Sequence, residues 1–213
     1  MSGGVDTALL FAWLEARSQA RGVAMPVPDR GGFRVDTASE SETCRWVYPH
    51  AVADIRALGR DIRESRQLIK MCGPVDELAG LLDERWDVEP TGYFMRATER
   101  WDGTELPAGF VAVAEMMGNV TKITISTEDG DYSASGYGSE TPKAFVYDRI
   151  VTVEQYRRQG LARALLTLLR SHRRDSNVPE LLVSSLAGHT LYCAIGWDTL
   201  STYSTATLKD FEL

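Results

Sequence analysis

The sequence predicts an α/β protein built on a mixed sheet, with an N-terminal α/β lobe (residues 1–95) ahead of a second domain (residues 96–213). Short β-rich runs alternate with helical stripes throughout the first half of the chain. Three strand-like runs then follow one another between residues 110 and 136. A strand, a helix and a further apolar strand come next, between residues 144 and 185. The alternation of short strands and helices gives the chain an α/β character.

Composition narrows the class of protein. A chain of 213 residues with 44% hydrophobic residues can bury a substantial core. Its net charge of −7 argues against nucleic acid as a main partner and fits a cationic small substrate slightly better than an acidic one. No apolar run approaches the ~20 residues that a membrane span needs, and no basic segment precedes the apolar N-terminal residues. We therefore expect a cytoplasmic protein without a membrane contact.

Cysteine and histidine usage predicts neither a disulfide framework nor a metal site. The cysteines are few, odd in number and far apart, which is typical of reduced intracellular thiols. The three histidines are not paired at the spacing of zinc ligands. The cysteines are Cys44, Cys72 and Cys193.

The first half carries no catalytic motif, and we interpret it as a lobe that packs on the second domain or shapes a substrate site. Asp6 can cap a helix from about residue 8 to residue 21, and Gly22 is placed to end it. Pro74 is placed at the start of another helix. The other predicted segments are loops at 25–32 and 86–90, strands at 33–36, 44–48, 67–72 and 93–97, and a helical stripe from 52 to 62.

The second half is predicted to begin with a meander of strands. Glu128-Asp129-Gly130 is a strong hairpin signal between two of them. Gly136-Tyr137-Gly138 is not interpreted as a phosphate loop, because no helix follows it, and a strand end or bulge is preferred. The predicted elements are strands at 110–116, 120–127, 132–136, 144–153 and 180–185, a helix from 158 or 160 to about 170, a short helix at 188–195 and a last strand at 199–208.

The stretch from Ile150 to Arg170 is a candidate anion-binding element. A β-branched run passes through a polar turn into a leucine-rich helix, with Gly160 at the turn and no acidic residue in the first helical turn. The free N–H groups of a helix N-terminus, together with the helix dipole, favour an anion there. The stretch has too few glycines for a dinucleotide fingerprint, and the chain has no phosphate-loop string.

Two motifs in a fixed relation make the second half resemble the GNAT superfamily of acyl-CoA-dependent N-acyltransferases. Residues 157–162 (RRQGLA) match Q/R-x-x-G-x-G/A, and residues 188–197 (GHTLYCAIGW) match G/A-x-x-L-Y-x-x-x-G-F/W. They lie about 30 residues apart with one apolar strand between them, as in that family. The resemblance covers roughly residues 109–213 and implies a GNAT-like fold.

The resemblance implies acetyl-CoA, or coenzyme A, as the cofactor. In the family the first motif binds the coenzyme A pyrophosphate through backbone N–H groups, here those of Arg158 to Arg163. The preceding strand would be the edge along which the pantetheine lies. The cofactor-binding residues expected on this basis are Ile150, Val151, Thr152, Arg158, Gln159, Gly160, Leu161, Ala162, Arg163 and Ser185.

Tyr192 is the candidate general acid. A thiol leaving group has a pKa of about 8.5 and a free tyrosine titrates near 10, so a tyrosine is protonated at neutral pH and can supply the proton. The resemblance places the matching tyrosine beside the sulfur. A core tyrosine with its hydroxyl at the surface is the alternative. A backbone N–H of the 150–153 strand could stabilise the negative charge that develops on the carbonyl oxygen.

The general base is open. Asp148 is the catalytic candidate, because period-2 alternation would place it on the same strand face as Ile150 and Thr152. A salt bridge with Arg149 or a neighbour is the alternative for Asp148, and an ordered water is an alternative to any side-chain base. Other candidates are Glu115 and His189. Cys193 is expected to be a small buried hydrophobe, with no histidine placed to activate it.

These inferences predict an acetyl-CoA-dependent N-acetyltransferase that transfers acetyl directly to an unidentified primary amine in a ternary complex. The amine could belong to a small molecule or to a peptide. Alternatives are a non-catalytic acyl-CoA sensor or scaffold, and a protein that binds another phosphate ligand. The family usually has two helices after its first strand, and the sequence leaves little room for them. Either the N-terminal half supplies them or that half is a degenerate copy of the fold. A homodimer is left open.

Overall fold

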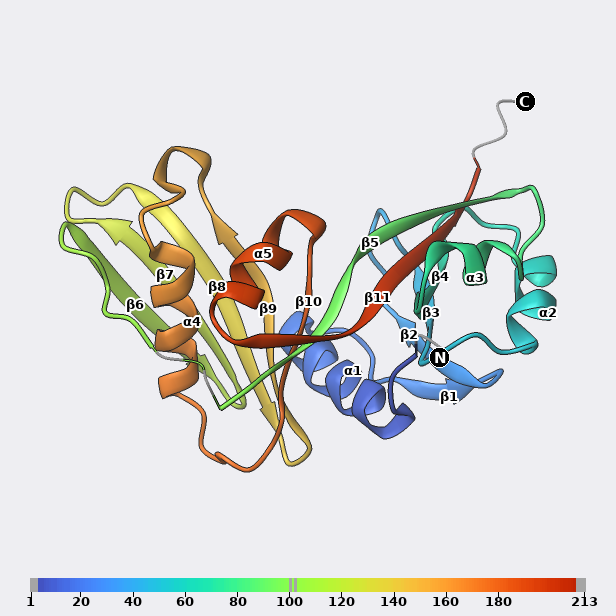
Figure 1. Cartoon of the computed structure of the whole chain (residues 1–213), viewed down its shortest axis with the longest axis horizontal. Coiled ribbons are helices and arrows are strands. Elements are labelled where there is room, and N and C mark those ends of the chain that lie inside the picture. The colour runs from blue at the N-terminus through green and yellow to red at the C-terminus, as the bar shows by residue number, and fades with distance from the viewer. Residues whose placement is uncertain (1–3, 100, 102, 210–213) are drawn as a thin grey trace.

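Within the residues that the structure describes, one mixed sheet of eleven strands runs through the protein (Figure 1). The structure is a computed structural model and describes residues 4–99, 101 and 103–209. The outermost residues of the two predicted domains, 1–3 and 210–213, and residues 100 and 102 lie outside that range. The order of the strands across the sheet is β1-β2-β3-β4-β11-β5-β10-β9-β8-β7-β6.

The elements follow one another along the chain as alternating strands and helices, and then as a meander. The strands are β1 (Val27–Asp29), β2 (Gly32–Asp36), β3 (Cys44–Tyr48), β4 (Gln67–Cys72), β5 (Trp86–Ala97), β6 (Phe110–Met117), β7 (Val120–Thr127), β8 (Tyr132–Thr141), β9 (Ala144–Thr152), β10 (Glu180–Ser184) and β11 (Trp197–Leu208). The helices are α1 (Thr7–Arg21), α2 (Asp54–Asp61), α3 (Val75–Ala79), α4 (Leu161–Ser171), α5 (Leu186–Ala194) and the 3-10 helix η1 (Glu154–Tyr156).

Two segments predicted as loops form strands. Residues 86–90 belong to β5, because β5 pairs with β11 along its whole length and a register shift next to Pro90 accommodates the missing N–H. Within the predicted 25–32 loop, Val27–Asp29 pairs with β2 through a tight turn in which Arg30 and Gly31 both have positive φ. The other predicted elements are present, and Gly136-Tyr137-Gly138 lies within β8 as part of the sheet.

The long strands β5 and β11 join the two halves of the sheet. They pair antiparallel from Trp86 and Leu208 at one end to Ala97 and Trp197 at the other. Figure 1 shows them running side by side from the first half of the molecule into the second. The predicted boundary at residue 95 falls within β5, and the division into two domains stays a prediction.

The strand pattern on one side of this pair is repeated on the other. In the first half, β1, β2 and β3 are antiparallel, β3 is parallel to β4, and β4 is antiparallel to β11. In the second half, β7, β8 and β9 are antiparallel, β9 is parallel to β10, and β10 is antiparallel to β5. The parallel pairs differ in length. β3 and β4 pair at five positions, whereas β9 and β10 pair at two, so these two strands separate beyond Val146 and Leu181.

Two helices cover opposite faces of β9. Phe145 and Tyr147 belong to the hydrophobic cluster of α4, whose buried residues are Leu161, Ala164, Leu165, Leu166 and Leu169. Ala144 and Val146 belong to the cluster of α1. Because successive side chains of a strand point to opposite faces, the cofactor motif at the start of α4 and the residues of α1 lie on different sides of the sheet.

A bulge in β9 breaks the predicted alternation. The register with β8 shifts between Ser135 and Tyr137, and Arg149 adopts a left-handed backbone (φ 52°). Beyond the bulge, Ile150 packs against the α4 cluster, whereas Asp148 bonds to Arg21 of α1. The prediction that Asp148 and Ile150 share a strand face is therefore wrong, because an extra residue separates them in the pairing.

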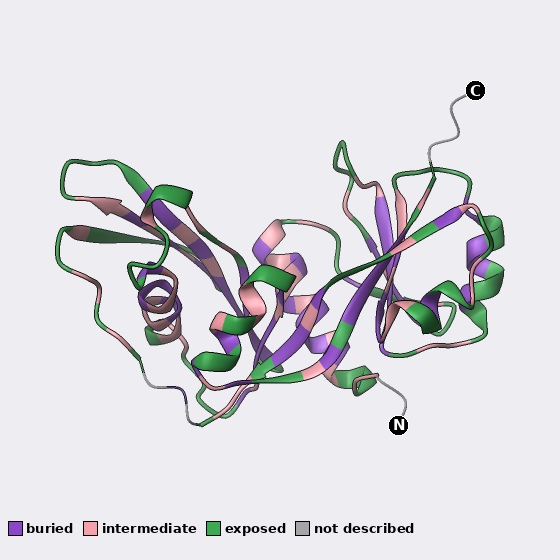
Figure 2. Ribbon diagram, turned by 45° about the horizontal axis from the view of Figure 1, so that its top comes forward, coloured by how far each residue is buried: buried purple, intermediate pink, exposed green. Residues whose placement is uncertain are grey.

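The far edge of the sheet is open. β6 is exposed along most of its length, and Figure 2 shows exposed residues on the outer strands of this half. Large apolar side chains are among the exposed ones: Val111, Val113, Met116 and Met117.

Gly92 makes possible the close approach of β5 to the end of β10, and its replacement tests this packing. A Cβ at Gly92 would lie 1.9 Å from the carbonyl oxygen of Ser184, a backbone atom that can move only with its strand. We expect Gly92→Ala to lower the free energy of unfolding by about 3 kcal/mol or more, measured by urea denaturation. Gly118→Ala is the control, since it has open space and a positive φ (62°), and should cost about 1 kcal/mol. Equal losses would contradict this account.

Candidate functional site

A cavity of about 310 Å³ lies where β9 and β10 separate. Residues from both faces of the sheet line the cavity, because the separated strands leave an opening through the sheet. From the α4 side it is lined by Ile150, Thr152, Ala162, Ser185, Gly188, Leu191 and Tyr192, and from the α1 side by Trp13, Arg17, Arg21, Lys70, Asp148 and Tyr203, among others. Half of the predicted site residues line this cavity, namely Asp148, Ile150, Thr152, Ala162, Ser185 and Tyr192.

The exposed edge of β9 offers backbone donors to this cavity. Val153 donates its N–H to the carbonyl oxygen of Ser133 in β8 (2.9 Å), so the preceding N–H, that of Thr152, points away from β8 toward the gap. Alternation gives the N–H of Ile150 the same direction. Val151 instead faces β8 with its backbone, paired with Ser135, and its side chain is exposed. Of the three predicted cofactor-binding residues of β9, Ile150 and Thr152 therefore direct their N–H groups toward the gap, and Val151 does not.

The N-terminus of α4 carries N–H groups without partners in the helix. Gly160 is the N-cap, with φ 83°, and it makes no side-chain capping bond. The first intrahelical donor is Ala164, which bonds to the carbonyl oxygen of Gly160 (3.0 Å). The N–H groups of residues 161 and 162 consequently have no acceptor inside the helix. Arg158 also has a positive φ (62°), a backbone strain that is common where a loop is shaped for a ligand.

Tyr192 lies in the wall of the cavity with 7% of its surface exposed. Its ring packs edge-on against Trp197, with centroids 5.8 Å apart. Burial raises the pKa of Tyr192 above its ordinary value of 10, so the hydroxyl keeps its proton at neutral pH. A buried, protonated hydroxyl beside the gap can donate a proton to a leaving group.

The turn between β10 and α5 adds two serine hydroxyls. Ser185 caps α5 by accepting a hydrogen bond from the N–H of Gly188 (3.1 Å), and both residues line the cavity. Ser184, which the sequence analysis missed, also lines it, and its buried Oγ has no hydrogen-bond partner. A buried hydroxyl without a partner in a cavity wall is available to a ligand.

Asp148 is held by arginines. Both of its carboxylate oxygens accept from Arg21, from Nε at 2.7 Å and from Nη2 at 2.9 Å. Arg149 lies at 3.2 Å and Arg17 at 3.6 Å. The salt bridge that was the alternative for this residue is therefore present. The role of Asp148 as a base stays a prediction.

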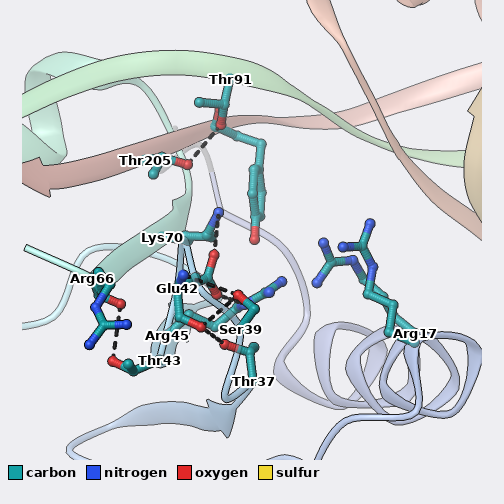
Figure 3. Close-up of polar contacts among 12 residues, drawn as sticks. Arg17, Thr37, Ser39, Glu42, Thr43, Arg45, Arg66, Lys70, Thr91 and Thr205 are labelled. Atoms are coloured by element: carbon teal, nitrogen blue, oxygen red, sulfur yellow. Dashed lines mark hydrogen bonds and ion pairs between the residues drawn. The ribbon is translucent and has the colours of Figure 1, made fainter.

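The basic side of the cavity was not predicted. Arg17 and Arg21 come from the C-terminal half of α1, and Lys70 comes from β4. Figure 3 shows Arg17 reaching from its helix toward a group formed by Glu42, Arg45 and Lys70. A single charged residue on an amphipathic helix or strand gives no local signal of this kind, since the residues meet only in the folded sheet.

Cys193 and His189 differ from their predicted settings. Cys193 is exposed, not a buried hydrophobe. His189, one helical turn earlier, brings its Nε2 to 3.4 Å from the Cys193 sulfur, so a histidine is in fact beside the thiol. The i, i+4 spacing on a helix was the missed signal. His189 also bonds to Thr199 (2.7 Å) and stacks on Tyr93. Neither residue lines the cavity beside Tyr192.

Glu115, the other predicted alternative base, lies on the exposed edge strand β6 and pairs with Lys122 at 3.3 Å. In the described part of the chain, no group of three or more His, Cys, Asp or Glu side chains is arranged to hold a metal ion. No helix of that part combines the length and apolar character needed to span a membrane.

Comparison with known proteins gives matches only among solved structures. No protein-family model matches the sequence, and no curated protein does. A GCN5-related N-acetyltransferase from Kribbella flavida matches with a TM-score of 0.69 at 12% identity, over 98% of each chain. A putative acetyltransferase of the GNAT family from Novosphingobium aromaticivorans matches with a TM-score of 0.55 at 16% identity, over 95% of this chain and 96% of that one.

A tandem GNAT protein from the clavulanic acid biosynthesis pathway also matches, with a TM-score of 0.53 at 13% identity over 79% of this chain and 76% of that one. At such identities the likeness concerns the fold and not the reaction. The resemblance that two short sequence motifs indicated is confirmed at this level. The chain has the mixed α/β fold of the GNAT superfamily of GCN5-related N-acetyltransferases.

Proposed function

We propose that the protein is an acetyl-CoA-dependent N-acetyltransferase that transfers acetyl directly to an amine in a ternary complex. The observation that carries the proposal is the cavity at the gap between β9 and β10. It connects a helix N-terminus suited to a phosphate group on one face of the sheet with a separate polar chamber on the other. Such a passage lets two substrates meet from opposite sides without an enzyme-bound intermediate.

The residues of the α4 face fit coenzyme A. The N–H groups of residues 161 and 162, preceded by Arg158, Gln159 and Gly160, would hold the pyrophosphate. The N–H groups of Ile150 and Thr152 are free of β8 and would pair with the pantetheine amides or polarise the thioester carbonyl. The unpartnered Oγ of Ser184 and the neighbouring Ser185 lie further along the same gap.

Acetyl-CoA supplies an acetyl thioester, whose C–S bond breaks as the C–N bond to the amine forms. Backbone N–H groups of β9 would stabilise the charge on the carbonyl oxygen. Tyr192 would give its proton to the departing sulfur and recover one from water. The amine loses its proton to water or to Asp148. Because Arg21 occupies both oxygens of Asp148, we favour water, with Asp148 fixing the positions of the arginines.

Tyr192→Phe tests the acid. The variant keeps the ring that packs on Trp197 but removes the proton donor. We expect kcat to fall about a hundredfold or more, with the affinity for acetyl-CoA unchanged, measured by thiol release with a panel of amines. Tyr132→Phe, at an exposed position, is the control and should leave kcat unchanged. An unaltered kcat in Tyr192→Phe would remove the tyrosine from the mechanism. Tight acetyl-CoA binding by wild type with no thiol release for any amine would favour the non-catalytic sensor.

Gly160→Leu tests the cofactor site. A Cβ at Gly160 would make only an ordinary contact with Pro107 (3.8 Å), so the side chain should not disturb the packing. The leucine would instead place a bulky group at the phosphate site and strain the positive φ of this position. We expect coenzyme A binding, measured by calorimetry, to be lost while the protein stays folded. Gly130→Leu is matched to it, because Gly130 also has a positive φ (96°) and open space, but lies in a distant hairpin. Wild-type affinity in Gly160→Leu would overturn the assignment of the pyrophosphate site.

A further inference from the structure

The chamber on the α1 face has an excess of positive charge. Five cationic side chains meet there and share two carboxylates. Asp148 serves three of them, and Glu42 pairs with the other two, Lys70 lying 3.9 Å from it. The five cations are Arg17, Arg21, Arg45, Lys70 and Arg149. This local charge is opposite in sign to the net charge of the whole chain, which is −7.

Three of these cations are poorly solvated: Arg17 and Lys70, which line the cavity, and Arg45 behind them. The side chains of Arg17, Lys70 and Arg45 are 18%, 16% and 6% exposed. Arg45 donates from Nε to Glu42, but its buried Nη1 has no hydrogen-bond partner. Figure 3 shows the guanidinium group of Arg17 directed toward Lys70 and Arg45. Buried cations are ordinarily matched by anions, so an unmatched set implies a missing negative group.

Burial and mutual repulsion both lower the pKa values of Lys70 and Arg17. Burial lowers the pKa of Lys70 to about 8, Glu42 acts against this, and Arg45, Arg17 and Arg21 lower the pKa further. Burial likewise lowers the pKa of Arg17 to about 10, with Arg45 and Arg21 adding to the effect and Asp148 opposing it. Lys70 is thus still charged at neutral pH, and a bound anion would relieve the repulsion.

The missing anion does not belong to the phosphates of coenzyme A. The phosphate site at the start of α4 is on the opposite face of β9 from α1. Lys70 shares its strand face with Cys72, which packs in the α1 cluster. The basic chamber therefore lies on the side from which the acceptor would reach the thioester. Trp13 and Tyr203 complete the walls on this side of the cavity, whose whole volume is about 310 Å³.

We propose that the acceptor is a small amine that also carries an anionic group, a carboxylate or a phosphate, and that Arg17 and Lys70, backed by Arg45, bind that group. This assignment rests on the proposed acetyltransferase function, because it names the acceptor for the same cavity. The anionic group would anchor the molecule among the cations, so that its amine lies toward the gap between β9 and β10. The arginine forks match the planar oxygens of a carboxylate or phosphate.

Lys70→Met tests the charge imbalance without any ligand. The folded-state pKa of about 8 lies below the ordinary 10.5, so the unfolded chain binds more protons in this window and stability rises with pH across it. Removing the cation should therefore raise Tm at pH 7, and the gain should shrink as the pH approaches 10.5. Lys143→Met removes an exposed lysine paired with Glu15 and should not raise Tm. A lower Tm in Lys70→Met at pH 7 would show that the cluster is already balanced.

Matched ligand pairs test the acceptor class directly. Calorimetry with and without coenzyme A would compare glycine with glycinamide, β-alanine with its amide, and O-phosphoethanolamine with ethanolamine. We expect the acidic member of at least one pair to bind wild type about tenfold or more tightly than its neutral partner. Lys70→Met should abolish this difference, and Lys143→Met should keep it. Thiol release with the same pairs should show the preference in the KM for the acceptor, while the KM for acetyl-CoA stays unchanged.

The outcomes separate the two proposals. A preference confined to the carboxylate pairs or to the phosphate pair identifies which anion is bound. Equal binding of both members of every pair by wild type overturns the anionic acceptor, even if neutral amines are acetylated. Acid-selective binding that depends on Lys70, without thiol release for any amine, supports the anion site and overturns the acetyltransferase function.

Discussion

The short pairing of β9 with β10 is the constraint on which the rest of the site depends. The two strands run parallel, share two residue pairs and then part. Their separation leaves backbone N–H groups of β9 without a strand neighbour in the middle of a sheet, where such groups are ordinarily paired. It also connects the two faces of the sheet through an opening, so that residues of α4, α5 and α1 line one cavity. Because Gly92 has no side chain, the end of β10 can lie close to β5, so the opening is on the β9 side of β10.

The bulge at Arg149 gives the cavity two chemically different sides. With regular alternation Asp148 and Ile150 would point to the same face, and the carboxylate would lie among the residues predicted to bind the cofactor. The extra residue turns Asp148 toward α1, where it organises Arg17 and Arg21, and leaves Ile150 on the α4 side. A left-handed backbone at a non-glycine residue is strained, and such strain is common at functional sites. Here it separates an apolar, hydrogen-bonding side from a strongly basic one.

Features that depend on neighbouring residues in the sequence were predictable, and contacts between residues far apart in the sequence were not. The leucine stripe of α4, Gly160 at its start and Tyr192 in α5 each follow from a few consecutive residues. The structure forms α4 with Gly160 as its N-cap and places Tyr192 in the wall of the cavity. Lys70 and Arg17 are separated by more than fifty residues and meet only because α1 packs across the sheet. The positive φ of Arg149 has no counterpart in the sequence pattern, which is why the orientation of Asp148 was misjudged. Pro90 favoured a loop, and pairing with β11 overrode that preference.

The longer pairing of β3 with β4 has a consequence for ligand stoichiometry. These strands occupy the place in the first half that β9 and β10 occupy in the second, but they stay joined at five positions. The backbone groups of β3 and β4 pair with each other, so the described sheet opens at one of its two parallel strand pairs. A chain whose halves repeat one strand pattern therefore offers this opening in one half, and under the proposed function we expect it to bind one acyl-CoA per polypeptide. The closed half instead contributes Lys70 of β4 to the wall of the cavity, with Glu42 and Arg45 beside it.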